Sequence, residues 1–162
     1  MTGAEVSALL GLAPLPLEGG MWARTWADEH GSGIYYLLQP GDFSALHRLD
    51  ATELWHHYAG DPVEMLLLEP EGGVRGHVLG DELAAGQRPC VVVKAGVWMG
   101  ARTVGAWSLV GATMAPPYRD KGFELGEAAE LMDRYPGAAD RIPRYVRASP
   151  VSGTSSAERS TQ

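Results

Sequence analysis

A chain of 162 residues with 45% hydrophobic and 20% charged residues has the composition of one globular domain. Its formal net charge of −7 and the absence of a basic cluster argue against a nucleic-acid partner or an anionic membrane. The N-terminus has no basic segment followed by an apolar run, and no apolar stretch is long enough to span a bilayer, which predicts a soluble, cytoplasmic protein. The single cysteine, Cys90, lies in the apolar run CVVV and is expected to be a small buried hydrophobe.

The pattern along the chain predicts many short strands rather than long helices. Residues 4–12 have the periodicity of a short helix, which Pro14 and Pro16 stop. Glycine and proline then separate short apolar runs at regular spacing. The expected strands cover residues 21–29, 34–39, 63–68, 74–79, 91–94, 97–103 and 107–114. Because helices do not alternate with these strands, a β-sandwich or barrel is predicted and a parallel α/β fold is not.

The stretch of residues 41–60, GDFSALHRLDATELWHHYAG, holds the chemistry. Its alternating halves are separated by a polar turn at residues 50–52, which predicts a β-hairpin. Pairing of the two halves would bring His47, near the end of the first strand, close to Glu53, near the start of the second. An imidazole and a carboxylate that converge in this way can transfer protons or bind a metal.

The end of the chain has a different character. Residues 126–135 have helical periodicity that ends at Pro136, and this helix is expected to cover part of the barrel. The chain therefore divides into an N-terminal arm (residues 1–17), a barrel with its C-terminal helix (18–146) and a disordered tail (147–162) with almost no apolar content.

The spacing Gly41-x5-His47-x-Leu49-x3-Glu53-x6-Gly60 resembles the first motif of the cupin superfamily. Residues 94–99, KAGVWM, lie where cupins carry their second motif. The runs HRLDATELWHHYAGDP, AGVW and LVGATMAPPY are similar to the cupin type-five family, and the likeness covers residues 18–136. The resemblance implies an all-β fold, the double-stranded β-helix or cupin jelly-roll barrel, with short helices at both ends. It also implies a site inside the barrel mouth and a homodimer.

The departures from the cupin motifs concern metal binding. The resemblance implies three histidines and a glutamate as ligands, but Leu49 and Met99 stand at two of the histidine positions. Neither an isobutyl group nor a thioether replaces imidazole for a hard or borderline divalent ion. The sequence thus predicts no tightly bound metal and no other cofactor, with a weakly held divalent ion on His47 and Glu53 as the alternative.

His47 and Glu53 are the predicted catalytic residues, weighed against a hydrogen-bonded barrel histidine and a structural ion pair. Predicted substrate-binding residues are Tyr36, Trp55, Trp98, Met99 and His57, for which core packing is the alternative. His57 has the same strand parity as Glu53, but four residues along a strand separate them by about 13 Å. His56 and His77 are expected to be structural or surface groups, and Arg24 is a weaker candidate for the pocket mouth.

Three functions that involve a small molecule remain open at this point, beside a weaker fourth, a structural dimer with no small-molecule site. The first is an enzyme of the isomerase, epimerase, lyase or cyclase type that acts on a small organic molecule by acid/base chemistry without a tightly bound metal. The second is a metal-dependent oxygenase or hydrolase that uses His47 and Glu53. The third is a non-catalytic module that binds a small molecule, since a fold does not fix a function.

Overall fold

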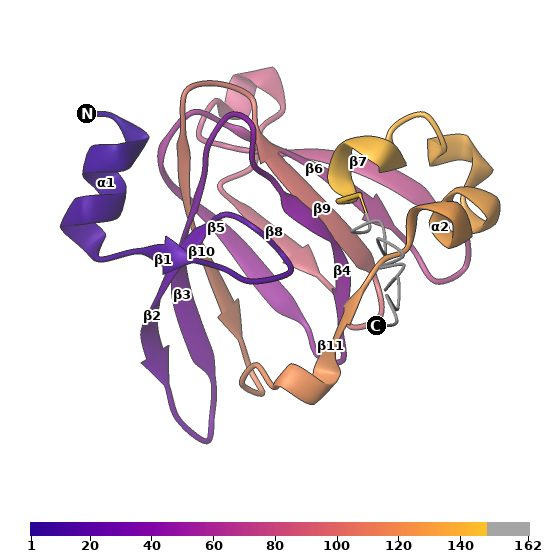
Figure 1. Ribbon diagram of the computed structural model, residues 1–162, viewed down its shortest axis with the longest axis horizontal. Coiled ribbons are helices and arrows are strands. Elements are labelled where there is room, and N and C mark those ends of the chain that lie inside the picture. The colour runs from indigo at the N-terminus through magenta and orange to yellow at the C-terminus, as the bar shows by residue number, and fades with distance from the viewer. Residues whose placement is uncertain (149–162) are drawn as a thin grey trace, which may run out of the picture.

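The computed structural model describes residues 1–148, which form two antiparallel β-sheets packed face to face (Figure 1). One sheet has six strands: β1 (Ala13–Pro14), β2 (Met21–Ala27), β3 (Ser32–Leu38), β10 (Ser108–Met114), β5 (Glu53–Gly60) and β8 (Cys90–Val93), in that spatial order. The other sheet has five: β11 (Phe123–Leu125), β4 (Ser44–Leu49), β9 (Trp98–Thr103), β6 (Val63–Leu68) and β7 (Val74–Leu79). The expected jelly roll is confirmed. Most of the predicted tail, from residue 149 on, lies outside the described residues.

The predicted hairpin between β4 and β5 is wrong. β4 pairs with β9 and β11, whereas β5 pairs with β10 and β8, so the two strands belong to different sheets. The polar residues 50–52 connect the sheets instead of turning within one. An alternating pattern on both sides of a polar turn is compatible with a hairpin in one sheet and with a connection between two sheets. Only the partner strands distinguish these two arrangements. By contrast, β6 and β7 form the hairpin that their sequence predicts.

The space between the sheets is filled by the main hydrophobic core. Leu38, Val63, Leu67 and Val110 are fully buried there, and each projects from the inner face of its strand. Complete burial of such a side chain stabilises the folded state by about 1.5–3 kcal/mol relative to exposure. One end of this interior is left open as the cavity described below.

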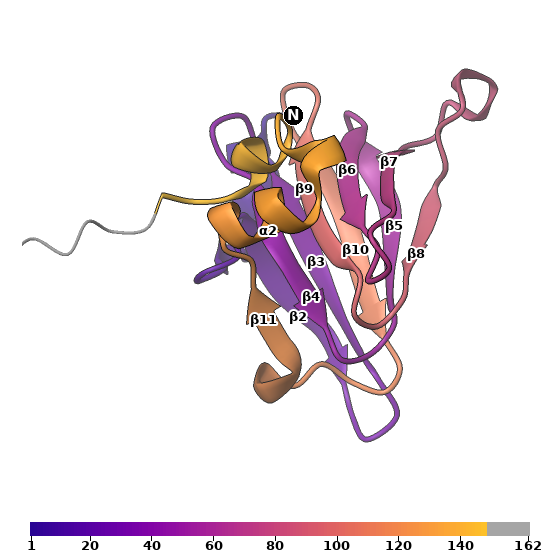
Figure 2. The same ribbon diagram turned by 90° about the vertical axis from the view of Figure 1, so that its right-hand side faces the viewer.

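A second core lies on the outer face of the five-stranded sheet, under α2 (Ala128–Arg134) and the 3-10 turns η3 (Pro136–Ala138) and η4 (Ile142–Tyr145) (Figure 2). Ile142 and Tyr145 are buried against the outer side chains of this sheet. Gly100 permits this contact, because a Cβ atom there would lie 2.9 Å from the Cβ of Tyr145. The C-terminal helix therefore covers the barrel, as the sequence predicts.

The N-terminal helix α1 (Gly3–Leu10) confirms the helix predicted near residues 4–12. Thr2 and Glu5 form a capping box at its start, and Gly11 ends it in the left-handed conformation with φ 62°. Neither this helix nor any other in residues 1–148 has the length and apolarity that crossing a bilayer requires. After α1, β1 adds to the edge of the six-stranded sheet beside β2.

The prediction that Cys90 is buried is wrong. Cys90 begins the edge strand β8, where Val91 and Val93 face the core and the alternate residues face outward. Cys90 and Val92 are consequently exposed. The apolar run gave no sign of this, because a four-residue edge strand buries only one face.

Candidate functional site

The open end of the barrel contains a cavity of about 570 Å³. The cavity is bounded by a turn that follows β1, which we term the wall segment (residues 15–20), by inner faces of both sheets, and by residues 117–123. Its lining is mainly apolar and aromatic, with a few polar groups. The lining residues are Leu15, Pro16, Leu17, Glu18, Trp22, Arg24, Ala27, Asp28, Ser32, Ile34, Tyr36, His47, Leu49, Glu53, Trp55, Ala112, Met114, Pro117, Tyr118, Asp120 and Phe123. Such a lining is typical of a site for a small organic ligand.

His47 lies on β4 at the base of this cavity and is only 2% exposed. Its Nδ1 lies 2.7 Å from the carbonyl oxygen of Ala45. Because a carbonyl oxygen only accepts hydrogen bonds, Nδ1 carries a proton. In a neutral ring Nε2 is then unprotonated and can accept a proton. The imidazole stacks on the ring of Phe123, with centroids 5.3 Å apart and planes at 21°, so its orientation is fixed from both sides.

Glu53 enters the same cavity from β5, on the opposite sheet, and is 8% exposed. Its Oε2 accepts a hydrogen bond of 2.8 Å from the indole Nε1 of Trp55. Desolvation by burial raises the pKa of Glu53 to about 7; the charge of His47 and the Trp55 hydrogen bond lower it, while the charge of Glu18 raises it further. Glu53 is thus a carboxyl group that is partly protonated at neutral pH.

Glu18 is a polar lining residue that the sequence did not reveal, and it is the one that lies beside His47. It lies on the wall segment, its Oε1 accepts a hydrogen bond of 2.8 Å from the hydroxyl of Ser44, and the same atom lies 3.8 Å from Nε2 of His47. The wall segment has no apolar period, and Gly19-Gly20 indicates only a turn. No local signal therefore pointed to this carboxylate.

Two predicted substrate-binding residues line the cavity, and both have partners within the protein. Tyr36 is 1% exposed, and its hydroxyl donates a hydrogen bond of 2.7 Å to the carbonyl of Gly19 in the wall segment. Burial, followed by the charge of Glu18, raises the pKa of Tyr36 well above its ordinary value. Its ring meets that of Trp55 edge-on at 5.7 Å, so that together they form an aromatic floor.

The structure does not bring the other three predicted substrate-binding residues to the cavity lining. Trp98 packs in the second core, with the guanidinium of Arg48 4.6 Å from its ring centroid. Met99 is opposite His47 in the β4–β9 pairing but is buried in the main core. His57 lies farther along β5 with Nε2 3.3 Å from the carbonyl oxygen of Asp61.

The mouth of the cavity carries charged groups of both signs. Asp28 accepts hydrogen bonds from the backbone amides of His30 and Gly31 and from the indole of Trp26. Arg24 lies on β2 at the cavity, with its guanidinium 5.9 Å from the ring of Trp22. At the mouth, the guanidinium of Arg24 can therefore contact a ligand, while the carboxylate of Asp28 accepts hydrogen bonds from its own loop.

The donor set does not fit a tightly bound divalent metal. Of the positions that the cupin resemblance implies, only His47 and Glu53 have ligand atoms suited to a hard or borderline divalent ion, since Leu49 has none and Met99 has only a thioether. Within residues 1–148, no group of three or more histidine, cysteine, aspartate or glutamate side chains could hold a metal ion. The chemistry derived below therefore uses only side chains of this protein.

Comparisons with known proteins agree with this architecture. A family model described as "Cupin superfamily (DUF985)" matches residues 4–126. A solved Shewanella oneidensis protein is 30% identical, with 92% of this chain and 99% of that chain covered and a TM-score of 0.87. A hypothetical protein from Leishmania major is 24% identical, with coverages of 91% and 100% and a TM-score of 0.84.

A more distant likeness shows the fold alone. The oxalate decarboxylase of Lactobacillus farciminis is 12% identical, with 86% of this chain and 43% of that chain covered and a TM-score of 0.57. No curated protein matches the sequence. The extent of the family match and the Shewanella relative together establish that this chain belongs to the cupin superfamily, in the family DUF985.

Proposed function

We propose that this cupin is an enzyme that moves a proton on a small organic molecule, in a reaction of the isomerase, epimerase, lyase or cyclase type, without a tightly bound metal. One observation carries the proposal. A buried imidazole with Nε2 able to accept a proton and a buried carboxyl group with a pKa near 7 line the same aromatic cavity. General acid/base catalysis requires such a pair, with one group placed to accept a proton and another able to donate one.

The roles of the two groups follow from their surroundings. Nε2 of His47 removes a proton from a carbon next to a carbonyl or similar activating group, since Nδ1 is already bonded to Ala45. The carboxylate of Glu18, 3.8 Å from Nε2, stabilises the positive charge that the ring then acquires. Glu53 donates its proton to the developing negative charge and recovers it in a later step.

The cavity supplies positioning and desolvation. Trp22, Trp55 and Phe123 provide flat apolar surfaces that hold an organic substrate against the proton-transfer groups. Arg24 at the mouth offers a positive charge to an anionic group of the substrate. Removal of either proton-transfer group is expected to slow catalysis by about 10²–10⁴-fold.

Solvent deuterium exchange tests the proposal. The protein is incubated in D2O at neutral pH with a panel of 2-oxo acids, 2-hydroxy acids and sugars, and 1H NMR follows the loss of C–H signals. At least one compound is expected to exchange with the wild-type protein, and His47→Gln and Glu53→Gln should each slow that exchange at least about 100-fold. His77→Gln, an imidazole on β7 outside the cavity lining, is the matched control. Exchange that persists in both cavity variants, or that no compound shows, would contradict the proposal.

A further inference from the structure

The wall segment is an irregular turn whose position depends on contacts with distant parts of the chain. Leu17, Gly19 and Gly20 all have positive φ, and at the non-glycine Leu17, with φ 67°, this backbone conformation is unfavourable. The turn closes on itself through bonds from the amide of Leu15 to the carbonyl of Gly20 and from the amide of Gly19 to the carbonyl of Leu15. Regular secondary structure does not hold Glu18 in place, so its orientation depends on contacts with other segments.

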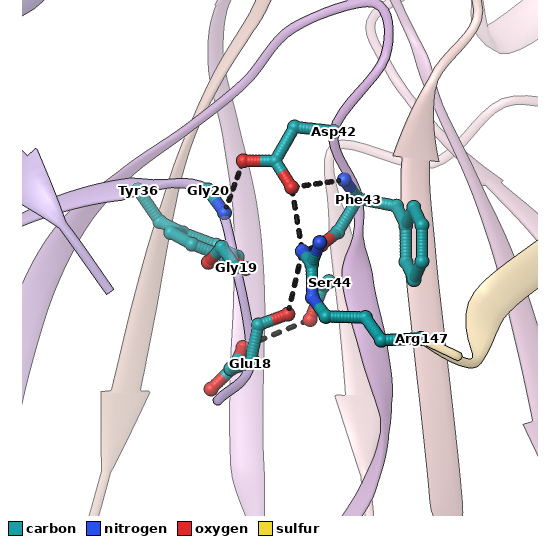
Figure 3. Close-up of polar contacts among 8 residues, drawn as sticks. All are labelled: Glu18, Gly19, Gly20, Tyr36, Asp42, Phe43, Ser44 and Arg147. Carbon is teal, nitrogen blue, oxygen red and sulfur yellow. Dashed lines mark hydrogen bonds and ion pairs between the residues drawn. The ribbon is translucent and has the colours of Figure 1, made fainter. Parts of the chain in front are cut away.

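Arg147, from the segment after η4, provides one of these contacts (Figure 3). Its Nη2 donates to Oδ1 of Asp42 at 2.5 Å, to the carbonyl oxygen of Phe43 at 2.9 Å and to that of Glu18 at 3.3 Å. The guanidinium also lies 4.5 Å from the ring centroid of Phe43. Gly19 leaves room for it, because a Cβ atom at that position would collide with Nη2.

Asp42 links Arg147 to the other end of the wall segment. Its Oδ2 accepts a 2.8 Å hydrogen bond from the amide of Gly20, while Oδ1 accepts from the amide of Phe43 and from Arg147. Burial raises the pKa of Asp42, but the hydrogen bonds from Arg147 and from the two amides outweigh it and leave the pKa below its ordinary value. The carboxylate is therefore ionised at neutral pH and holds the wall segment and the guanidinium together.

The residue that Arg147 holds is the one that faces His47. The Glu18 carbonyl accepts from Arg147 and from the amide of Ala45, while the Glu18 carboxylate accepts from Ser44 and faces Nε2 of His47. Arg147 itself follows the buried Tyr145, which fixes this part of the chain on the barrel. It also lies beyond residues 4–126, the part that matches the family model.

We propose that Arg147 is a positioning residue: the C-terminal segment holds the wall segment so that the carboxylate of Glu18 faces His47. An effect of Arg147 on catalysis rests on the proposed function. The positioning of Glu18 by Arg147 does not, because it can be measured without a substrate. All three acceptors face the single nitrogen Nη2, so a lysine at this position, which keeps the charge and has a nitrogen with three hydrogens, should hold the turn in part.

The test compares Arg147→Gln and Arg147→Lys with Glu18→Gln in the full-length protein. The first measurement is the 15N chemical shift of Nε2 of His47 at a fixed neutral pH. The change in this shift in Glu18→Gln gives the effect of losing the neighbouring carboxylate. Arg147→Gln is expected to move the resonance in the same direction by at least half as much, and Arg147→Lys by less. A second measurement, hydrogen exchange at the amides of Gly20 and Ala45, should show at least tenfold faster exchange in Arg147→Gln.

The matched control is Arg144→Gln, which removes another exposed arginine of the same terminal segment. It should leave both measurements at their wild-type values. His47 resonances that stay at the wild-type position in Arg147→Gln, or that are the same in Glu18→Gln as in wild type, would overturn the proposal. Both measurements are made without substrate, so a failure of the deuterium-exchange assay would leave this inference standing.

Discussion

The indole Nε1 of Trp55 donates a 2.8 Å hydrogen bond to Oε2 of Glu53, two residues earlier on the same strand. Both side chains project from the inner face of β5, so the donor is held beside the carboxyl group by the strand itself. A hydrogen bond to the ionised form stabilises that form and lowers the pKa of the acid. Trp55 therefore limits how far burial raises the pKa of Glu53.

Trp55→Phe is expected to raise the pKa of Glu53 from about 7 by about one unit, because a hydrogen bond to a charged group contributes about 1.5 kcal/mol. Titration of the Glu53 carboxyl 13C resonance measures the change. Trp98→Phe, in the second core, is the control and should leave the titration unchanged. A pKa that is the same in both variants would show that the indole does not act on this carboxyl group.

Glu53→Gln should change how stability depends on pH. The folded protein retains the proton of Glu53 up to about pH 7, whereas the unfolded chain releases it near the ordinary value of 4.5. The folded state thus binds more protons between these values, and its stability falls as pH rises from about 4.5 to about 7. Glutamine does not titrate, so the variant lacks this fall. Between pH 4 and pH 8 the free energy of unfolding of wild type should therefore drop by up to about 3 kcal/mol more than that of the variant. Urea denaturation at both pH values measures these free energies of unfolding. An equal change between pH 4 and pH 8 in the two proteins would contradict the prediction.

The sequence predicted the barrel and its two central side chains because these depend on local pattern. The alternation of apolar residues predicted most of the strands, and the resemblance to the cupin motifs implied a site inside the barrel mouth, where both His47 and Glu53 line the cavity. The strand pairing around them was predicted wrongly, since β4 and β5 lie in different sheets. The two residues still share the cavity because the connection between them crosses from one sheet to the other.

Other parts of the site depend on contacts that no local pattern encodes. Glu18 faces His47 because its turn is held by Asp42, by Ser44, by the amide of Ala45 and by Arg147, which lies 129 residues farther along the chain. Trp98 illustrates the converse. It is next to a motif in sequence, yet it packs under the C-terminal helices, since β9 buries side chains on both of its faces.

The C-terminal cover should contribute to stability independently of the cavity. Ile142, the first residue of η4, is fully buried against the five-stranded sheet. Ile142→Ala is expected to lower the free energy of unfolding by about 2–5 kcal/mol, because it removes buried methyl groups and leaves a void. Denaturant unfolding measures the loss, and Ile142→Val, which removes one methylene group, should cost only about 0.5–1.5 kcal/mol. Equal stability of the alanine variant and wild type would contradict the packing described for this layer.

The outer face of the six-stranded sheet is the surface on which we expect the homodimer implied by the cupin resemblance. Tyr58 and Val92 are 50% and 53% exposed there, and Cys90 is exposed beside them. The ring of Tyr58 lies over Gly111 and meets Tyr35 edge-on at 6.1 Å, so this part of the face is aromatic. Exposed aromatic and aliphatic side chains on one face of a sheet are candidates for a contact between protein chains.

If two copies associate through this face as proposed, Val92→Glu should convert the dimer to a monomer, because a buried carboxylate without a partner strongly opposes association. Light scattering after size exclusion at micromolar concentration gives the mass of both proteins. Val78→Glu is the matched control, since Val78 is a 39% exposed valine on β7 of the other sheet. The dimer should survive this change. A wild-type monomer, or a dimer that tolerates Val92→Glu as well as Val78→Glu, would show that the two copies do not associate through the six-stranded sheet.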